Sequence, residues 1–470
     1  MSLIMRRALH PPHWGFLPRP SSSCNRVFCS STATEGYSRS EILSIRQRYH
    51  GPLTTLYNEP LVITKGRMQY LYDDSGRKYL DLLGGIVTVS VGHCHPRITE
   101  VIQRQAAELV HTSAIYAHPQ PTLYAKELVE RLPQRPDGKS WKVYFVNSGS
   151  EANDLAVMLA RLYTGRWPIV ALRNGYHGMT GGTQGLTAVG FYKHQVPAGF
   201  GVEHLAVPKV YKSRLGPEAS VEDIVRYHLN DLDDHLDSCM SDGQVAAFIA
   251  ESTQGVGGVV TLPPGYLQGV YDRIRSVGGI CIADEVQTGF GRTGTNFWGF
   301  QNHGVVPDVV TMAKSIGNGM PLAAVAARED IMNELGRKAF FNTYGGGPVQ
   351  TAVGREVLRI IDDDKLMDHC RDVGGYFLSH LEELKVKHSH IVGDVRGTGL
   401  LIGIEHIGES PAAEMKWAWN RLKEKGFLVG GPGPHGNIFR IAPPMCITKD
   451  DVDGFCTALD EVYAQVAARR

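Results

Sequence analysis

Two charged side chains stand where apolar segments of this chain end. Asp284 follows the apolar segment 279–283, and Lys314 follows the apolar segment 309–312. A carboxylate carried to the end of a buried strand needs a cation, which a protonated ring nitrogen can supply. A lysine beside glycines can project into a cleft and, with a lowered pKa, form a Schiff base, although most lysines taken singly are solvated surface residues.

A third apolar segment, 142–146, is followed by a string that suits an anion, Asn147-Ser148-Gly149-Ser150. This string opens a predicted helix, so its hydroxyls, backbone N–H groups and the positive end of the helix dipole could bind a phosphate. An ordinary serine cap is the alternative, and it would need only one of these residues.

A fourth segment, 169–172, is followed by a tyrosine and a histidine between two glycines, Gly175-Tyr176-His177-Gly178. This order favours a ring presented over a flat ligand, and a turn with a partly buried tyrosine is the alternative. Since ligands of open α/β sheets bind beyond the carboxyl ends of the strands, all four segments are expected to face one ligand. That ligand needs a phosphate, a flat ring, a protonated ring nitrogen and an aldehyde, and pyridoxal 5′-phosphate has all four.

Other motifs point away from dinucleotide and metal chemistry. Residues 289–294 match the glycine pattern of dinucleotide-binding folds, but no helical pattern follows them, so a glycine-rich loop is the better interpretation. His93-Cys94-His95-Pro96 resembles a pair of metal ligands, yet without further clustered ligands it is more typical of a turn. The eight cysteines include no CxxC pair, which indicates free thiols in a reducing compartment and no metal site.

The elements that must position these residues follow from alternating strand and helix patterns. Strands are expected at 61–63, 69–72, 78–82, 142–146, 169–172, 246–251, 279–283, 309–312, 399–405 and 438–441, and helices at 96–109, 121–132, 150–163, 265–277 and 348–363. This alternation predicts an α/β fold with a mostly parallel sheet covered on both faces. The segment after 376 predicts a second α/β layer.

Charge separates the first 40 residues from the rest of the 470-residue chain. The chain has 48 basic and 48 acidic residues, but residues 1–40 hold five arginines and one acid, so the remainder carries −4. Neutrality argues against a dedicated nucleic-acid binder, and no apolar run is long enough for a membrane helix. An Arg-rich, Ser-rich, acid-poor start predicts a mitochondrial transit peptide, with cleavage near residues 29–40. A disordered tail and a plastid address are the alternatives.

The stretches 284–294 and 313–321 together resemble the signature of the class-III aminotransferases, and the similarity runs from about residue 50 to 465. The resemblance implies fold type I of the pyridoxal-phosphate enzymes: a large domain with a mostly parallel seven-stranded sheet flanked by helices, and a smaller α/β domain built from both chain ends. It also implies homodimers, with tetramers possible, that share active sites. The expected division is 1–40 transit peptide, 41–95 first part of the small domain, 96–347 large domain, and 348–470 linking helix and remaining small domain.

The resemblance also implies a role for each site residue. Lys314 is implied to be the Schiff-base lysine and the proton shuttle. Asp284 is implied to pair with the pyridinium nitrogen. Further implied roles are Gln287 bonded to the ring 3′-oxygen, Tyr176 stacked on the ring beside His177, Ser148, Gly149 and Ser150 around the phosphate, Thr343 at the phosphate of the partner subunit's site, Glu251 supporting the pocket, and Arg440 gripping the substrate carboxylate.

Three departures from the pattern of relatives bear on substrate and cofactor. Val256 stands where ornithine and GABA aminotransferases have a glutamate that gates the carboxylate-binding arginine, and Ile86 stands where ornithine aminotransferase has a tyrosine. Both apolar residues favour short substrates. Gly347 replaces an asparagine before Pro348 and is expected to loosen the loop that carries Thr343.

The stretches 251–258 and 341–346 are most similar to mitochondrial members of the class that act on alanine and glyoxylate. The implied activity is therefore ping-pong transfer of an amino group from L-alanine to glyoxylate, giving pyruvate and glycine. Three alternatives stay open: an ω-aminotransferase for β-alanine, β-aminoisobutyrate or GABA with pyruvate or glyoxylate; a class-III decarboxylase or aminomutase; and a non-catalytic binding protein on this fold.

Overall fold

A seven-stranded sheet forms the centre of the larger layer in the computed structural model, which describes residues 34–52, 55–196, 199, 201–238, 240 and 244–469. The strands run in the order β4 (Trp141–Val146), β12 (Ala323–Arg328), β11 (Val309–Met312), β10 (Ile280–Asp284), β7 (Ala247–Glu251), β5 (Ile169–Leu172) and β6 (Val202–Leu205). Neighbours are parallel except at β12, which runs antiparallel to β11 and β4. The predicted mostly parallel, seven-stranded sheet is confirmed.

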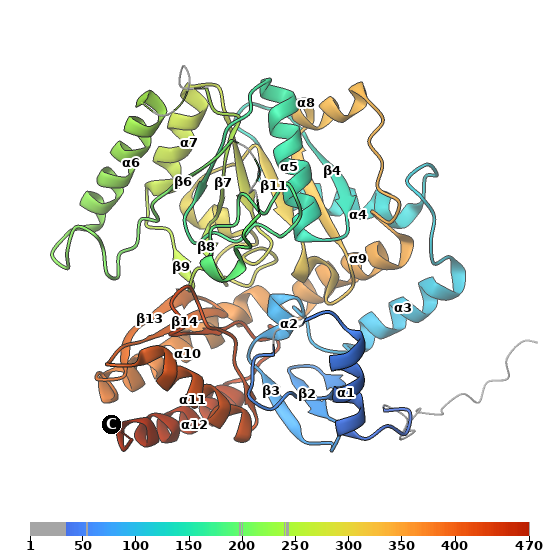
Figure 1. Ribbon diagram of the computed structural model, residues 1–470. Helices are drawn as coiled ribbons and strands as arrows, with labels where there is room; N and C mark the ends of the chain where they lie inside the picture. The colour runs from blue at the N-terminus through green and yellow to red at the C-terminus, as the bar shows by residue number, and fades with distance from the viewer. Residues whose placement is uncertain are drawn as a thin grey trace, which may run out of the picture.

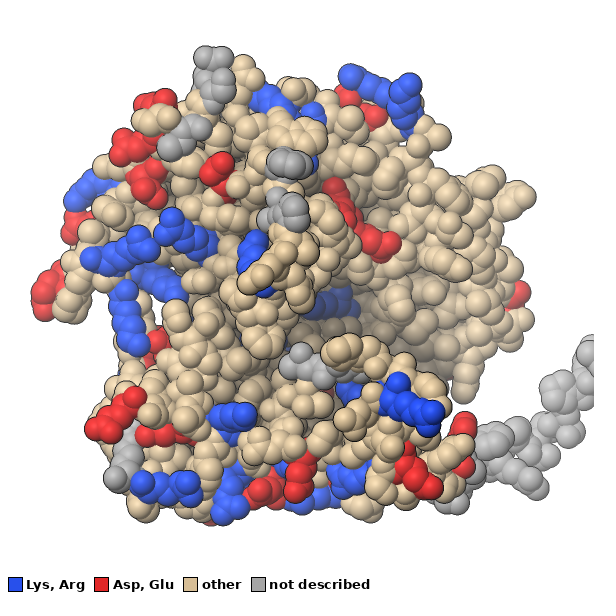
Figure 2. Space-filling model, in the orientation of Figure 1, with Lys and Arg blue, Asp and Glu red and all other residues tan. Residues whose placement is uncertain are grey.

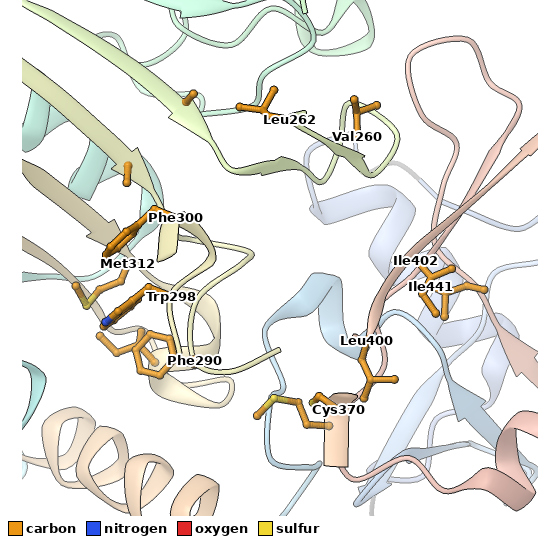
Figure 3. Packing of buried hydrophobic residues seen from close by; sticks show 14 of the residues in the cluster. Val260, Leu262, Phe290, Trp298, Phe300, Met312, Cys370, Leu400, Ile402 and Ile441 are labelled. Atoms are coloured by element: carbon orange, nitrogen blue, oxygen red, sulfur yellow. The ribbon is translucent and has the colours of Figure 1, made fainter. Parts of the chain in front are cut away.

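The strands are apolar along their whole length because both faces of the sheet are covered. On β10, Ile280 and Ile282 face the cluster that α5 (Gly149–Thr164) packs onto, whereas Cys281 and Ala283 face the other core. That second core is continuous with the C-terminal layer, and Figure 3 shows members from both parts, including Trp298 and Ile441. Helices α4 (Pro119–Glu130), α6 (Val221–Ser238) and α7 (Tyr266–Ser276) complete the larger layer, drawn at the top of Figure 1.

Both chain ends build the lower layer of Figure 1. The N-terminal strands β1 (Ile63–Arg67), β2 (Tyr70–Asp73) and β3 (Lys78–Asp81) are joined by the C-terminal strand β15 (Phe427–Leu428), which pairs in parallel with β3. A second sheet contains β13 (Val392–Thr398), β14 (Leu401–His406) and β16 (Ile438–Ile441), and α10 (Leu366–Lys387), α11 (Pro411–Glu424) and α12 (Lys449–Ala467) pack around it. Helices α3 (Pro96–Glu108) and α9 (Pro348–Asp363) connect the layers.

Several elements differ from the sequence prediction. The strand expected at 61–63 lies at Ile63–Arg67 instead, because pairing with β2 rather than local hydrophobicity defines it. Strands β6 and β12 and helix α6 were not predicted, whereas the loop expected at 289–294 is confirmed as a series of turns. Of the predicted targeting segment 1–40, residues 1–33 lie outside the described residues. Helix α1 (Arg39–Tyr49) includes the last two residues of that segment. None of the helices in the described part of the chain combines the length and hydropathy of a membrane span.

Candidate active site

Three of the predicted residues meet at the carboxyl ends of neighbouring strands. Asp284 ends β10 and lies opposite Glu251, the last residue of β7, and Thr311 of β11. Lys314 follows β11 by two residues and opens the 3-10 turn Lys314–Gly317. The structure therefore brings one amine and two carboxylates to the same edge of the sheet, as the order of strands and polar residues predicts.

Lys314 is half-buried and has a backbone φ of 54°, in the left-handed region that lysine seldom adopts. Burial lowers the pKa of its amine to about 8, and the nearby charge of Arg440 adds to this, while Glu251 and Asp284 oppose it. Among the described residues, no hydrogen bond or ion pair to the amine is present. A neutral, unbonded amine can act as a nucleophile or a base near neutral pH.

Asp284 is 2% exposed and is held by three donors. Its Oδ2 accepts hydrogen bonds from Asn153 Nδ2 and His177 Nδ1, each at 2.8 Å, and its Oδ1 accepts one from the amide of Val286 at 3.1 Å. Burial alone would lower the pKa of His177, but the hydrogen bond and charge of Asp284 raise it by more, so the pKa lies above its ordinary value. These bonds fix the carboxylate at the strand end.

Glu251 and Gln287 form a second buried polar group beside Asp284. Glu251 accepts hydrogen bonds from the amides of Tyr176 (3.2 Å) and Gly255 (3.0 Å) and from Gln287 Nε2 (3.2 Å). Burial, with the negative charge of Asp284, raises the pKa of Glu251. Gln287 Oε1 is buried and has no hydrogen-bond partner in the described part of the chain, so this side chain keeps one unused acceptor.

The N-terminus of α5 points at the lysine loop. Ser148 caps the helix, and its Oγ accepts from the amide of Glu151 at 3.2 Å, so this hydroxyl is already engaged as an ordinary cap. A Cβ on Gly149 would lie 3.1 Å from a methyl group of Val286, so a larger residue here would have to push that side chain aside. The first helical N–H groups, from Gly149 and Ser150, have no acceptor inside the helix and remain suited to an anion.

Arg440, on β16, brings a positive charge to the site from the lower layer. Its side chain is buried, and Nε and Nη1 have no hydrogen-bond partner among the described residues. Burial lowers its pKa, and Tyr192 and Glu251 oppose that effect. The pocket at this guanidinium is lined by Tyr192, Val256 and Gly258 among others. A buried guanidinium with two free N–H directions fits a carboxylate.

Tyr176 borders the same space, since its ring contacts that of Tyr192 edge-on with centroids 5.0 Å apart. Thr343 and Ile86 do not join the cluster. Thr343 is exposed on a loop whose neighbour Asn342 accepts a hydrogen bond from Asn147 Nδ2 at 3.0 Å, and Ile86 is 53% exposed. Each faces outward from the described chain.

Sequence reasoning missed three residues near the site. Asn153 lies one helical turn after Ser150, so its spacing could have identified it as the second donor to Asp284. Tyr192 lies in an unpredicted short 3-10 turn, and Arg292 is fully buried within the glycine-rich loop. Arg292 donates to the carbonyls of Leu400 (3.2 Å) and Pro443 (2.7 Å), which ties that loop to the lower layer.

The unused groups of the cluster fit pyridoxal 5′-phosphate together with a carboxylic acid substrate. An unbonded amine, a buried carboxylate, helix N-terminal amides and a buried unpaired guanidinium match an aldehyde, a ring nitrogen, a phosphate and a substrate carboxylate. Gln287 Oε1, which lacks a partner, matches the ring hydroxyl.

Comparison with known proteins gives a consistent picture. The profile of the family "Aminotransferase class-III" matches residues 54–463. The chain is 45% identical to "Alanine–glyoxylate aminotransferase 2 homolog 2, mitochondrial" of Arabidopsis thaliana, over 90% of this chain and 87% of the relative. It is 42% identical to "Alanine–glyoxylate aminotransferase 2, mitochondrial" of Homo sapiens, over 93% and 88%.

Solved structures of similar fold include enzymes with different activities. A phospholyase from Arthrobacter in complex with phosphoethanolamine has a TM-score of 0.83 and 33% identity, and the match covers 90% of this chain and 99% of that chain. An (S)-enantioselective ω-transaminase from Thermomicrobium roseum has a TM-score of 0.84 and 30% identity, covering 92% and 100%.

Proposed function

The chain belongs to the class-III aminotransferases, which use pyridoxal 5′-phosphate, and from this premise we propose that it transfers the amino group of L-alanine to glyoxylate, giving pyruvate and glycine. One observation carries the substrate assignment. The buried guanidinium of Arg440 has two unused N–H directions, and its pocket is lined by the apolar Val256 and contains no acidic side chain. A small substrate with one carboxylate suits this pocket, because none of the lining side chains is acidic and Tyr192 carries the only polar side chain there besides Arg440.

The bound cofactor supplies an aldehyde and a protonated ring that accepts electrons. We assign its binding to the residues at the strand ends. Lys314 would bond the aldehyde, and Asp284, fixed by His177 and Asn153, would face the ring nitrogen. The amides at the start of α5 would hold the phosphate, with Ser148, Gly149 and Ser150 closest to it. Gln287 would accept a hydrogen bond from the ring hydroxyl with its free Oε1, and Tyr176 would cover the ring. Glu251, which bonds Gln287 and the amide of Tyr176, would orient these two residues.

The proton movements follow from the same residues. Arg440 binds the carboxylate of alanine and fixes the position of its α-carbon. Lys314 Nζ would remove the α-proton, and its lowered pKa favours the neutral form that this step needs. Water would release pyruvate while the amino group stays with the cofactor. Glyoxylate would then bind to Arg440, and Lys314 would return a proton to the acceptor's carbon to give glycine. This order is a ping-pong reaction.

We also propose that the enzyme is a homodimer with shared sites. Large apolar side chains are exposed on the loop after α3 and on the loop before α9, namely Leu109, Val110, Ile115, Tyr116, Phe341 and Tyr344. The two loops meet where the rings of His111 and Tyr344 lie 5.5 Å apart, and Figure 2 shows few charges over this part of the surface. Such a patch is typical of a subunit interface. Thr343 lies within it and would reach the partner's phosphate site.

The relatives' names support a mitochondrial location, and we propose the matrix, reached through a transit peptide in residues 1–40. The domain limits at 41–95, 96–347 and 348–470 also remain proposals. Within the described residues they are supported by the pairing of β15 with β3, which joins the two chain ends in one sheet.

A panel of donors and acceptors tests the proposed substrates. With glyoxylate as acceptor, kcat/KM for L-alanine should exceed that for β-alanine, β-aminoisobutyrate and GABA, and phosphoethanolamine should release no phosphate. A preference for the ω-amino acids would overturn the assignment in favour of an ω-aminotransferase. Carbon dioxide or an isomerised product would indicate a decarboxylase or aminomutase, and binding of cofactor without any turnover would indicate a non-catalytic protein.

A further inference from the structure

A short left-handed turn, α2 (Gly84–Val87), lies between the N-terminal sheet and the active site. All four residues have positive φ, including Ile86 and Val87 at 64° each. β-Branched residues strongly disfavour this region, so the surroundings must hold the turn in place. Strained backbone at two consecutive residues other than glycine often occurs where a segment supports a functional site.

The turn packs against the strand that carries Arg440. Val87 is fully buried in a small cluster with Val259, Leu401 and Ala442. Ala442 lies two residues after Arg440, and Val259 follows Gly258, which lines the pocket of that arginine. The contact is close, because a Cβ on Gly84 would lie 2.8 Å from the carbonyl oxygen of Ala442. The turn therefore does not line the carboxylate pocket itself but packs against residues next to those that do.

A single buried carboxylate holds the start of the turn. Asp81 Oδ1 accepts hydrogen bonds from the amides of Leu83 (3.0 Å) and Gly84 (2.9 Å). Asp81 Oδ2 accepts a hydrogen bond from His93 Nε2 at 2.8 Å. Among the described residues, His93 is the only side chain that donates to this carboxylate. Asp81 is 2% exposed, so no bulk water replaces a lost donor at low cost.

His93 is itself fixed. Its backbone exchanges two hydrogen bonds with Met68, each at 2.7 Å. The His93 side chain also packs closely on Gly66, because a Cβ added to this glycine would lie 2.9 Å from the Cβ of His93. The histidine that the sequence suggested as part of a turn is therefore an anchored donor aimed at Asp81. No cluster of three or more potential metal ligands occurs among the described residues.

The lysine loop is held by other bonds. Ser90 Oγ donates to the carbonyl of Ser315 at 3.0 Å, and Asn318 bonds both the amide of Val91 and the carbonyl of Gly92 at 3.0 Å. These bonds do not involve His93 or Asp81. Loss of the histidine should therefore disturb the turn and leave Lys314 in place.

We propose that His93, acting through Asp81, is a positioning residue for substrate binding: it locks the left-handed turn Gly84–Val87 against the residues next to the lining of the Arg440 pocket. The role in substrate binding rests on the aminotransferase function proposed above. The role in holding the turn does not, because it follows from the hydrogen bonds alone.

A pair of amide variants tests the proposal. In His93→Gln the side-chain amide reaches the position of Nε2 and can donate to Asp81, whereas the amide of His93→Asn is too short. In the holoenzyme, His93→Asn should raise KM for both alanine and glyoxylate about tenfold, with kcat within threefold and the cofactor absorbance unchanged. The peptide spanning 82–92 should exchange deuterium faster in His93→Asn, and His93→Gln should restore both properties.

A histidine–aspartate pair far from the site gives the matched control. His388 Nε2 and Asp460 Oδ1 are 2.6 Å apart in the lower layer, so His388→Asn removes a comparable bond. It should leave KM and exchange of 82–92 unchanged. The proposal is wrong if His388→Asn raises KM as much, if His93→Asn loses kcat or cofactor instead of substrate affinity, or if exchange of 82–92 does not change. If the protein has no aminotransferase activity, exchange alone decides whether His93 holds the turn.

Discussion

Lys314 enters the site as an amine whose pKa is lowered to about 8, mainly by burial. An amine reacts only when neutral, and the neutral fraction rises with pH and levels off above the pKa. In cofactor-free protein, reductive methylation of Lys314, followed by peptide mass spectrometry, should therefore reach half its maximum near pH 8 and level off by about pH 9 to 10. A methylation profile of Lys314 that still rises above pH 10 would contradict the lowered pKa.

Arg440 is a second residue whose environment makes a measurable prediction. Its guanidinium is buried without a counterion, so Arg440→Met should raise the melting temperature of the substrate-free protein while raising KM for alanine and glyoxylate by about 10–100-fold. Arg421→Met removes an arginine that is 46% exposed and paired with Glu424, and should change neither. An unchanged KM in Arg440→Met would remove the proposed carboxylate site.

At the level of elements, Asp308 organises the amino ends of the strands, opposite the active site. Its buried carboxylate accepts from the amide of Cys281 and from three arginines, Arg135, Arg275 and Arg328, at 3.0–3.2 Å. Removing it takes one carboxylate from three arginines, and among the described residues the largely buried Arg135 and Arg328 then keep only Asp137 and Asp330 as carboxylate partners. Asp308→Ala should lower the free energy of unfolding by about 3–5 kcal/mol in urea titration, with turnover per folded molecule unchanged.

The control for Asp308 is an exposed ion pair. Asp368, 53% exposed and paired with Arg371, should lose at most about 1 kcal/mol on replacement by alanine. A similar loss for both variants, or a loss of kcat in Asp308→Ala, would contradict the separation between a stabilising end and a catalytic end of the sheet.

Elements with strong local signals were predictable from the sequence, and those defined by their neighbours were not. The apolar runs of β5, β11 and β16 and the long helix α9 match their predicted ranges closely. Strand β12 is antiparallel and four of its six residues are alanine, and β6 is an edge strand with two polar residues, so neither shows an apolar β-branched run.

The same distinction holds for the site. Asp284 and Lys314 were predictable because each directly follows an apolar run, and parallel strands bring such positions together. The cap at Ser148 is local, because its partner Glu151 lies three residues later, and the sequence already offered it as an alternative. The unused N–H groups of Arg440 and the contact between His93 and Asp81 instead depend on segments that meet only in the folded chain. No spacing along the chain encodes them. The predicted loosening of the loop by Gly347 is not tested by the geometry, since its φ of −55° is ordinary for any residue.

At the level of the whole molecule, the exposed apolar patch predicts a dimer that cofactor binding requires. Ile115 is 74% exposed within that patch, and Ile115→Glu should produce monomers in sedimentation velocity and weaken retention of pyridoxal phosphate. Val386 is 76% exposed on α10, outside the patch, so Val386→Glu is the matched control and should stay dimeric. A dimer that survives Ile115→Glu with unchanged cofactor affinity would place the interface elsewhere.

If this chain carries an amino group from alanine to glyoxylate at Lys314, each half of the reaction can be observed by itself. The holoenzyme alone, without an acceptor, should lose its cofactor absorbance band on addition of L-alanine and release one pyruvate per site. After removal of excess alanine, glyoxylate should restore the band and yield one glycine per site, whereas Lys314→Ala should show no turnover. A band that L-alanine leaves unchanged, or that glyoxylate does not restore, would contradict the account.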